Sequence, residues 1–161
     1  MNVLFTDEEL TKYAERFLKD NFNIDLLIPI KRNNRLRTSL GRYVMDNASN
    51  PIRIELSGKL LTYGKESTII GVLKHECIHY AYHVQGKDMR DGHPQFEKAL
   101  QQFNAPSTES LKVGKFYTFE CVGCKKRGET QLKRLAFKPE DYRTHCCQEK
   151  LRIVRETIYR G

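Results

Sequence analysis

The first apolar stripe along the chain has the period of an α-helix. It consists of the positions Leu10, Tyr13, Ala14, Phe17 and Leu18. Thr6 and Glu9 stand three residues apart just before this stripe and form a capping box, which favours a helix start at that point. We therefore predict an amphipathic helix that ends near Asp20 and packs the stripe into a core.

The period then changes to two. Ile52–Leu56 alternates strictly between apolar and charged residues, which predicts a strand whose isoleucine and leucine side chains face the core while Arg53 and Glu55 face away. Gly41–Met45 follows a polar turn and predicts a second strand. Ile28–Ile30 is expected to form a short edge strand, where its central proline is tolerated.

A third segment combines helical spacing with chemistry. It contains the run His75-Glu76-Cys77-Ile78-His79, and its flanks are apolar on more than one side: Ile69, Ile70, Val72, Leu73, Ile78 and Ala81. Such flanks predict a helix buried inside a domain, where charged and titratable groups need partners. A chance match of two histidines and a glutamate on a solvated helix face is the alternative, and the apolar flanks argue against it.

The spacing of this run predicts a zinc hydrolase. Residues four apart lie on one helix face about 6 Å apart along the axis, so His75 and His79 can bind one zinc ion. Glu76 lies on the neighbouring flank, where its carboxylate can take a proton from a zinc-activated water without binding the metal. The expected reaction is metal-assisted hydrolysis, most often of peptides.

A third protein ligand is needed, and the sequence offers His93 or Glu97. Gly86 can end the metal helix, and the chain can then reverse and begin a second helix over residues 94–103, so a histidine at that helix start can point back at the metal. We favour His93, with Glu97 one turn further on as the alternative. His83 lies two turns beyond His75, too far along a straight helix to share the ion.

The order helix, strands, metal helix, second helix predicts an α+β domain, with the small sheet over the metal helix and its outer strand free to pair with an extended peptide. Residues 105–110 read as a linker, so we expect a first domain over residues 1–104 and a second module over residues 111–161. That module holds 13 Lys and Arg against 6 Asp and Glu and so carries most of the net charge of +8.

The basic module predicts two further properties. Its cations Lys125, Lys126, Arg127, Lys133 and Arg134 alternate with aromatic residues, a mixture suited to phosphate contacts and base stacking, although aromatic residues in a small β module are commonly its core. Strands over residues 116–120 and 131–137, with Cys121 and Cys124 between them, predict a structure like a zinc ribbon. A ribbon without zinc, held by its apolar strands, is the alternative.

The apolar runs and the cysteines of the chain indicate the cellular compartment of the protein. The chain has no long apolar run, and its first residues read as neither a signal peptide nor a membrane span. One of its five cysteines stands alone, two form a C-x-x-C motif and two are adjacent. This pattern suits metal binding better than a disulfide framework. We therefore expect a cytoplasmic protein without a membrane partner.

The run Leu73–Phe96, which includes Gly92-His93-Pro94-Gln95-Phe96, resembles the SprT-like family of zinc metalloproteins, among them the protease domain of Spartan. Arg35, Gly41–Tyr43 and the cysteine-bearing tail extend the resemblance over most of the chain. It implies a zincin-like fold, zinc ligands His75, His79 and His93, Glu76 as the catalytic residue, and proteins held on DNA as the substrate class.

The resemblance also shows a departure in the tail. Relatives typically carry a cysteine after a tyrosine-arginine pair, and Thr144 stands at that position here, so that Cys147 is the aligned ligand. Either His145 or Cys146 must supply the fourth group beside Cys121 and Cys124, or the site is weakened or empty. The second structural zinc thus rests on an irregular ligand set.

The sequence therefore favours a zinc peptidase acting on DNA-associated proteins, with the tail bringing it to DNA. The main rival is a DNA-associated regulatory or scaffold protein in which zinc is only structural. A zinc hydrolase with a small amide substrate is a weaker rival. Glu76 separates the first two, because a structural zinc site has no use for a carboxylate that activates water.

Overall fold

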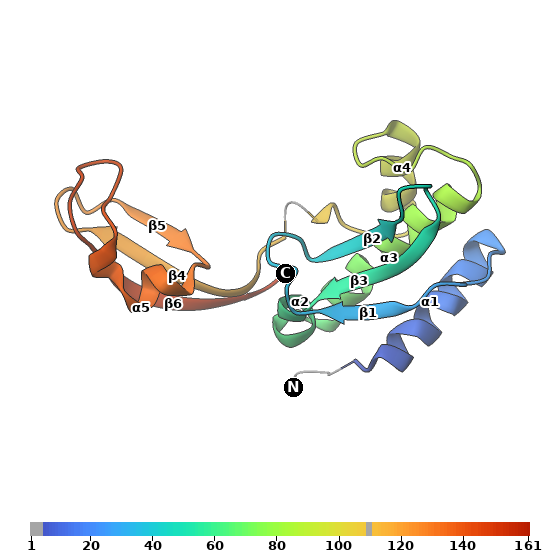
Figure 1. The fold of residues 1–161 in the computed structure, drawn as a ribbon, viewed down its shortest axis with the longest axis horizontal. Coiled ribbons are helices and arrows are strands. Elements are labelled where there is room, and N and C mark those ends of the chain that lie inside the picture. The colour runs from blue at the N-terminus through green and yellow to red at the C-terminus, as the bar shows by residue number, and fades with distance from the viewer. Residues whose placement is uncertain (1–4, 109–110) are drawn as a thin grey trace. The chain divides into compact units, whose positions relative to one another are not determined.

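The computed structural model describes residues 5–108 and 111–161, and it is a mixed α+β structure. The chain forms two compact units. The first comprises the chain up to Lys112 together with Arg160 and Gly161, and the second comprises Val113–Tyr159. Each unit has its own small sheet (Figure 1).

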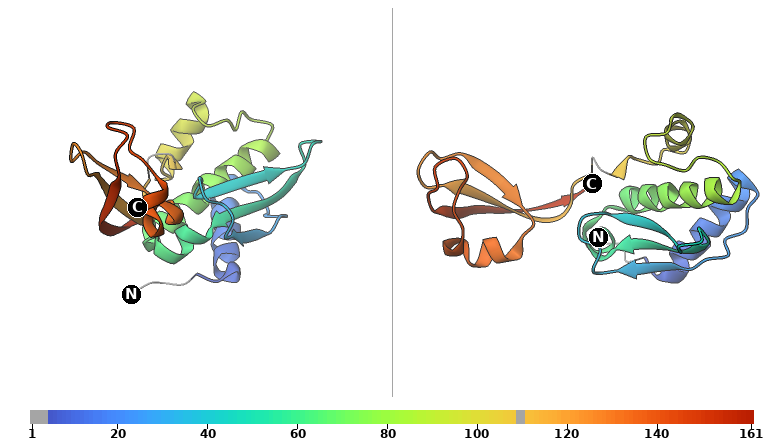
Figure 2. Two further views of the ribbon diagram at one scale, coloured as in Figure 1. Left: turned by 60° about the vertical axis from the view of Figure 1, so that its left-hand side comes forward. Right: turned by 45° about the horizontal axis from the view of Figure 1, so that its top comes forward.

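The first unit contains four helices and three strands within the described residues. In chain order they are α1 (Asp7–Phe22), β1 (Ile30–Asn33), β2 (Gly41–Met45), β3 (Pro51–Ser57), α2 (Gly58–Tyr63), α3 (Glu66–Val84) and α4 (Pro94–Gln102). The sheet has the order β1-β3-β2, with β1 parallel and β2 antiparallel to β3. Helices α1 and α3 pack on one face of this sheet (Figures 1 and 2).

Local sequence explains where the main helices begin and end. Thr6 caps α1, its side chain accepting from the Glu9 N–H while the Glu9 carboxylate accepts from the Thr6 N–H, so the predicted capping box is confirmed. Helix α3 ends at Val84, and Gly86 follows in the left-handed conformation with φ of 70°. The predicted turn at Gly86 and the helix after it are therefore present.

The strand β3 departs from strict alternation. Ile54 and Leu56 are fully buried as predicted, but Ile52 is exposed and Glu55 is buried. Glu55 does point away from the core face, as predicted, although it is buried there, whereas the prediction that Ile52 is a core residue is wrong. Alternation assumes that a side chain on the open face of a sheet meets water, whereas hydrogen-bonding neighbours from the adjacent strands cover Glu55.

The second unit is a three-stranded sheet with short helices. Its elements are β4 (Val113–Cys121), β5 (Arg127–Thr130), α5 (Lys133–Phe137), a 3₁₀ turn (Pro139–Asp141) and β6 (Leu151–Arg160), and the strand order is β5-β4-β6. The expected strand over residues 131–137 is wrong. The chain returns along β4 directly after the Cys121–Cys124 turn, with Glu120 opposite Arg127, and the segment rich in helix formers then becomes α5.

None of the helices in the described ranges is long and apolar enough to cross a membrane.

Candidate metal centre

Three side chains from α3 and the loop after it converge on one point. The Nε2 atom of His75 lies 3.0 Å from the Asp91 Oδ1 atom, and the Nε2 atom of His79 lies 3.5 Å from the same oxygen. The two imidazole rings have centroids 4.9 Å apart, as expected for residues four apart on one helix. The rings are further fixed by the buried Phe96, which stacks on His79 at 4.3 Å and meets His75 edge-on.

The hydrogen bonds of the Nδ1 atoms of His75 and His79 determine which nitrogen of each ring is available to a metal ion. His75 Nδ1 lies 2.8 Å from the Pro106 carbonyl oxygen, and His79 Nδ1 lies 2.7 Å from the Met89 carbonyl oxygen. Because a carbonyl only accepts, each Nδ1 must carry the hydrogen, and each neutral ring then presents its Nε2 lone pair to the cluster. Burial and the neighbouring His75 lower the pKa of His79, which favours this neutral form.

The residues present fit a zinc ion. Two Nε2 lone pairs and one carboxylate oxygen face one another, an arrangement that a shared metal ion or a proton would stabilise. Zinc bound at about 2.0–2.1 Å in a tetrahedral site places its ligand atoms about 3.3 Å apart, close to the two observed separations. Imidazole nitrogens held by carbonyl hydrogen bonds are also the usual outer arrangement of zinc-binding histidines.

The structure places Asp91, and not His93, beside the two helix histidines. His93 is the N-cap residue of α4, and its Nε2 atom lies 3.6 Å from Asp88 Oδ2. Asp88 is held in turn by the Arg90 guanidinium. His93 as third ligand stays a prediction, and so does Glu97, whose carboxylate accepts a hydrogen bond from the Gly92 N–H.

Glu76 is buried in the wall of the same site. Only 3% of the residue is exposed, and its carboxylate accepts a hydrogen bond from the Tyr43 backbone. Burial and the nearby Asp91 charge raise the pKa of Glu76 to about 8, which suits a group that accepts and later donates a proton near neutral pH. Gly41 makes room for this carboxylate, since a Cβ atom there would lie 2.8 Å from Glu76 Oε1.

A cleft of about 760 Å³ opens over these groups. It is lined by Gly41, Arg42 and Tyr43 of β2 and by the loop over residues 89–92. His75, Glu76 and His79 of α3 line it as well. An edge strand, two imidazoles and a buried carboxylate therefore line one cavity that is open to solvent.

Sequence reasoning missed two residues of this site. Asp91 belongs to an irregular loop, where no periodic pattern predicts side-chain positions, although its place two residues before His93 was a signal. Tyr43 lines the cleft, and its hydroxyl lies 2.6 Å from His83 Nδ1. That contact gives His83 a structural role away from the metal cluster. Burial and, to a smaller extent, the neighbouring Tyr80 raise the pKa of Tyr43 to about 12.

A second candidate metal site lies in the second unit. The Sγ atoms of Cys121, Cys124, Cys146 and Cys147 all lie within 4.8 Å of one another. Tetrahedral zinc with thiolate ligands at about 2.3 Å needs sulfur atoms about 3.8 Å apart, so the cluster is close to the required size. Cys146 is the fourth member of this cluster and could supply the group that the irregular second cysteine pair left open, whereas His145 does not belong to the cluster.

Thr144 lies beside this cluster. Its hydroxyl is 3.3 Å from Cys121 Sγ and is buried. Hydrogen bonds from Thr144 and from the Cys124 backbone lower the pKa of the Cys121 thiol to about 6, which favours the thiolate that binds metal. Cys124, Cys146 and Cys147 are exposed.

The basic residues expected to contact nucleic acid are spread over the turn after β4, over β5 and over α5. Lys125, Lys126 and Lys133 are exposed, whereas Arg127 pairs with Glu120 at 3.0 Å and Arg134 pairs with Asp141 at 3.6 Å. Two of the interleaved aromatic residues differ sharply, because Tyr117 is buried and Phe137 is 74% exposed. Phe137 is thus the aromatic side chain that is open for stacking.

Comparison with known proteins identifies relatives of this chain. The model of the SprT-like family matches residues 7–115. The chain is similar to "Protein SprT-like" of Bacillus subtilis, with 32% identity over 92% of this chain and 97% of that protein. The proteins of the same name from Bacillus velezensis and Bacillus cereus are 30% and 29% identical, and the matches cover 92% and 94% of this chain and 98% of each relative.

Proposed function

The chain belongs to the SprT-like family, and from that membership and the geometry of the cluster we propose that it is a zinc-dependent peptidase. The observation that carries the proposal is the convergence of His75 Nε2, His79 Nε2 and Asp91 Oδ1 beside the buried Glu76 in an open cleft. A purely structural zinc site would be closed by a fourth protein ligand and would need no such carboxylate.

The proposed ligands are the two helix histidines and a third group from the loop after α3, for which Asp91 has the favourable distances. Zinc bound there would lower the pKa of a water molecule and polarise the carbonyl of the scissile bond. Glu76 accepts the proton of the attacking water and returns it to the departing amine. Without metal, burial and the Asp91 charge raise the pKa of Glu76 to about 8, and the charge of a bound zinc ion would lower it and favour the carboxylate that acts as a base.

The strand β2 is the proposed binding edge for the substrate backbone. It lies at the edge of the sheet, and Gly41, Arg42 and Tyr43 line the cleft. An extended peptide that pairs with this edge would present successive backbone carbonyls to the floor of the cleft. Main-chain pairing is tolerant of sequence, so we expect the cleft to accept varied protein substrates.

The second unit is proposed to hold a structural zinc and to bind DNA. Cys121, Cys124, Cys146 and Cys147 form the proposed ligand set for this zinc. The exposed lysines of the turn after β4 and of α5, with the exposed Phe137, provide phosphate contacts and a stacking surface. Proteins bound to DNA are then the proposed substrates of the first unit.

The test is cleavage of a basic protein bound to single-stranded DNA by the zinc-loaded chain, with the Glu76→Gln variant alongside. Zinc content is measured for each sample by atomic emission. Glu66→Gln is the matched control, since Glu66 is an exposed glutamate in the first turn of the same helix.

Loss of cleavage in Glu76→Gln with zinc retained, and normal cleavage by Glu66→Gln, is the expected result. A loss of at least about 100-fold is expected, because general acid–base groups contribute about 10²–10⁴ to the rate. Equal cleavage by wild type and Glu76→Gln would reject the proposed role of this carboxylate.

A further inference from the structure

One face of the sheet in the first unit carries an unusual set of charges. Helices α1 and α3 cover the face that bears Ile54 and Leu56. On the other face, β1, β3 and β2 place Lys31, Glu55 and Arg42 in one row, because Lys31 and Arg42 are both in register with Glu55. Arg53 shares this face, since it lies two residues from Glu55 on the same strand.

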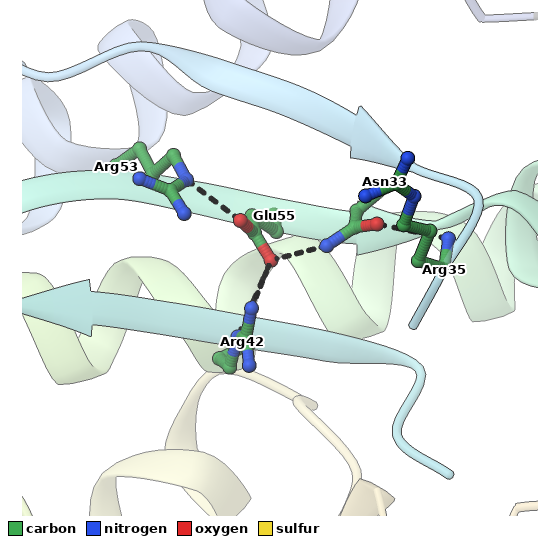
Figure 3. A network of polar contacts seen from close by, with 5 residues as sticks. All are labelled: Asn33, Arg35, Arg42, Arg53 and Glu55. Atoms are coloured by element: carbon green, nitrogen blue, oxygen red, sulfur yellow. Dashed lines mark hydrogen bonds and ion pairs between the residues drawn. The ribbon is translucent and has the colours of Figure 1, made fainter. Parts of the chain in front are cut away.

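The Glu55 carboxylate holds the two arginines in fixed positions (Figure 3). Oε1 accepts from Arg53 Nε at 2.6 Å, and Oε2 accepts from Arg42 Nη2 at 2.8 Å and from Asn33 Nδ2 at 2.8 Å. The Glu55 side chain is only 4% exposed, whereas the Arg42 and Arg53 side chains are 51% and 39% exposed. A buried anion under two partly exposed guanidinium groups orients these groups before any ligand arrives.

The face keeps a surplus of positive charge and of free donors. Arg53 donates to Glu55 through Nε, and Arg42 donates to Glu55 through Nε and Nη2. The remaining guanidinium nitrogens of both arginines have no hydrogen-bond partner within the described ranges. The exposed side chains of Lys31 and Arg35 likewise make no ion pair with any residue that the structure describes. Arg35 lies next to Asn33, whose side chain accepts from its backbone N–H (Figure 3). Two cations thus contact the Glu55 carboxylate, and two more lie near it without an anionic partner among the described residues.

We propose that this sheet face, defined by Lys31, Arg35, Arg42 and Arg53, is a binding surface for the phosphates of a nucleic acid. The spacing of the guanidinium N–H groups matches that of phosphate oxygens, and the backbone of a nucleic acid carries one negative charge at every nucleotide. Adjacent strands are about 4.8 Å apart, so the row from β1 to β2 spans about 10 Å and can serve more than one phosphate. An acidic peptide is disfavoured, because peptide grooves usually add apolar anchor pockets and the strand positions on this face are mainly charged.

This surface differs from the basic second unit, and its binding does not depend on catalysis. The experiment uses the full zinc-loaded chain and a fluorescein-labelled, 20-nucleotide single-stranded DNA of mixed sequence, with affinity measured by anisotropy over a series of salt concentrations. The test variant is Lys31→Gln/Arg35→Gln, which leaves the Glu55 network intact. The matched control is Arg16→Gln/Lys98→Gln, which removes two exposed cations from α1 and α4 of the same unit.

The test variant is expected to bind the DNA about tenfold more weakly near 0.1 M salt and to lower the slope of log K against log salt by about 1.4, since each phosphate contact on a single strand contributes about 0.7. The control variant should retain the wild-type slope. Equal changes in both variants would overturn the proposal, because they would report total charge only. A test variant that binds poly-glutamate more weakly but binds the DNA with wild-type affinity would also overturn it, in favour of an acidic peptide. Circular dichroism melting of both variants confirms that each remains folded.

Discussion

Replacing Asp91 by alanine tests which residue completes the metal site. The carboxylate oxygen of Asp91 lies 3.0 and 3.5 Å from the two histidine Nε2 atoms, whereas His93 Nε2 lies 3.6 Å from Asp88 and the buried His93 Nδ1 has no hydrogen-bond partner among the described residues. The Asp91 side chain is 63% exposed, so its removal should leave the fold intact. Groups that only support zinc ligands contribute about 10–100-fold to metal affinity, so loss of a direct ligand should exceed about 100-fold, or about 2.8 kcal/mol.

The assay is competition for zinc against a chromogenic chelator, with His93→Ala as the paired variant. Cobalt substitution separates the two metal sites, because thiolate ligands in the second unit give charge-transfer absorption that nitrogen and oxygen ligands do not. We expect Asp91→Ala to lose the nitrogen and oxygen site while His93→Ala stays within about threefold of wild type. The reverse order of effects would refute the assignment of Asp91 and establish His93 as the ligand.

Three further predictions concern other parts of the chain. Cys146→Ser should remove the zinc of the second unit, and Thr144→Cys added to that variant should restore it, as measured by metal stoichiometry; retention of zinc by Cys146→Ser would contradict the ligand set. Gly41→Ala should lower cleavage and reduce the free energy of unfolding in urea by about 1–3 kcal/mol, because the new Cβ meets Glu76 Oε1 at 2.8 Å; unchanged values would show that the wall of the cleft yields. Glu55→Gln should flatten the loss of stability in acid. Burial raises the pKa of Glu55, but the hydrogen bonds from its partners outweigh burial and hold this pKa below its usual value. The stability that Glu55 contributes is therefore present above its pKa in the unfolded chain and is lost as the pH falls through its pKa in the folded chain. Parallel acid profiles of wild type and variant would contradict this.

The parts of the fold that follow from local rules were predictable from the sequence. The capping box at Thr6 defined the start of α1, and the segment Gly41–Met45 forms β2 with the expected bounds. The spacing of His75 and His79 was sufficient to bring their rings together, because one helix carries both.

The parts that depend on tertiary contacts were not predictable. The burial of Glu55 requires arginines from β2 and β3 and an asparagine from β1, and alternation along one strand contains no information about them. The position of Asp91 depends on a loop without periodicity. The segment Lys133–Phe137 has both apolar residues and helix formers, and pairing of β4 with the earlier Arg127–Thr130 decided its conformation.

The most direct test of the central claim is reconstitution of proteolysis from a metal-free sample. The chain is stripped with a chelator, reloaded with known equivalents of zinc, and assayed for cleavage of a DNA-bound basic protein with and without single-stranded DNA. A zinc peptidase predicts that cleavage disappears with the metal, returns when the site of His75 and His79 is filled, and increases with DNA. No cleavage by a chain that holds zinc at these histidines, with a broad set of DNA-bound proteins, would contradict the claim and favour a scaffold with structural zinc.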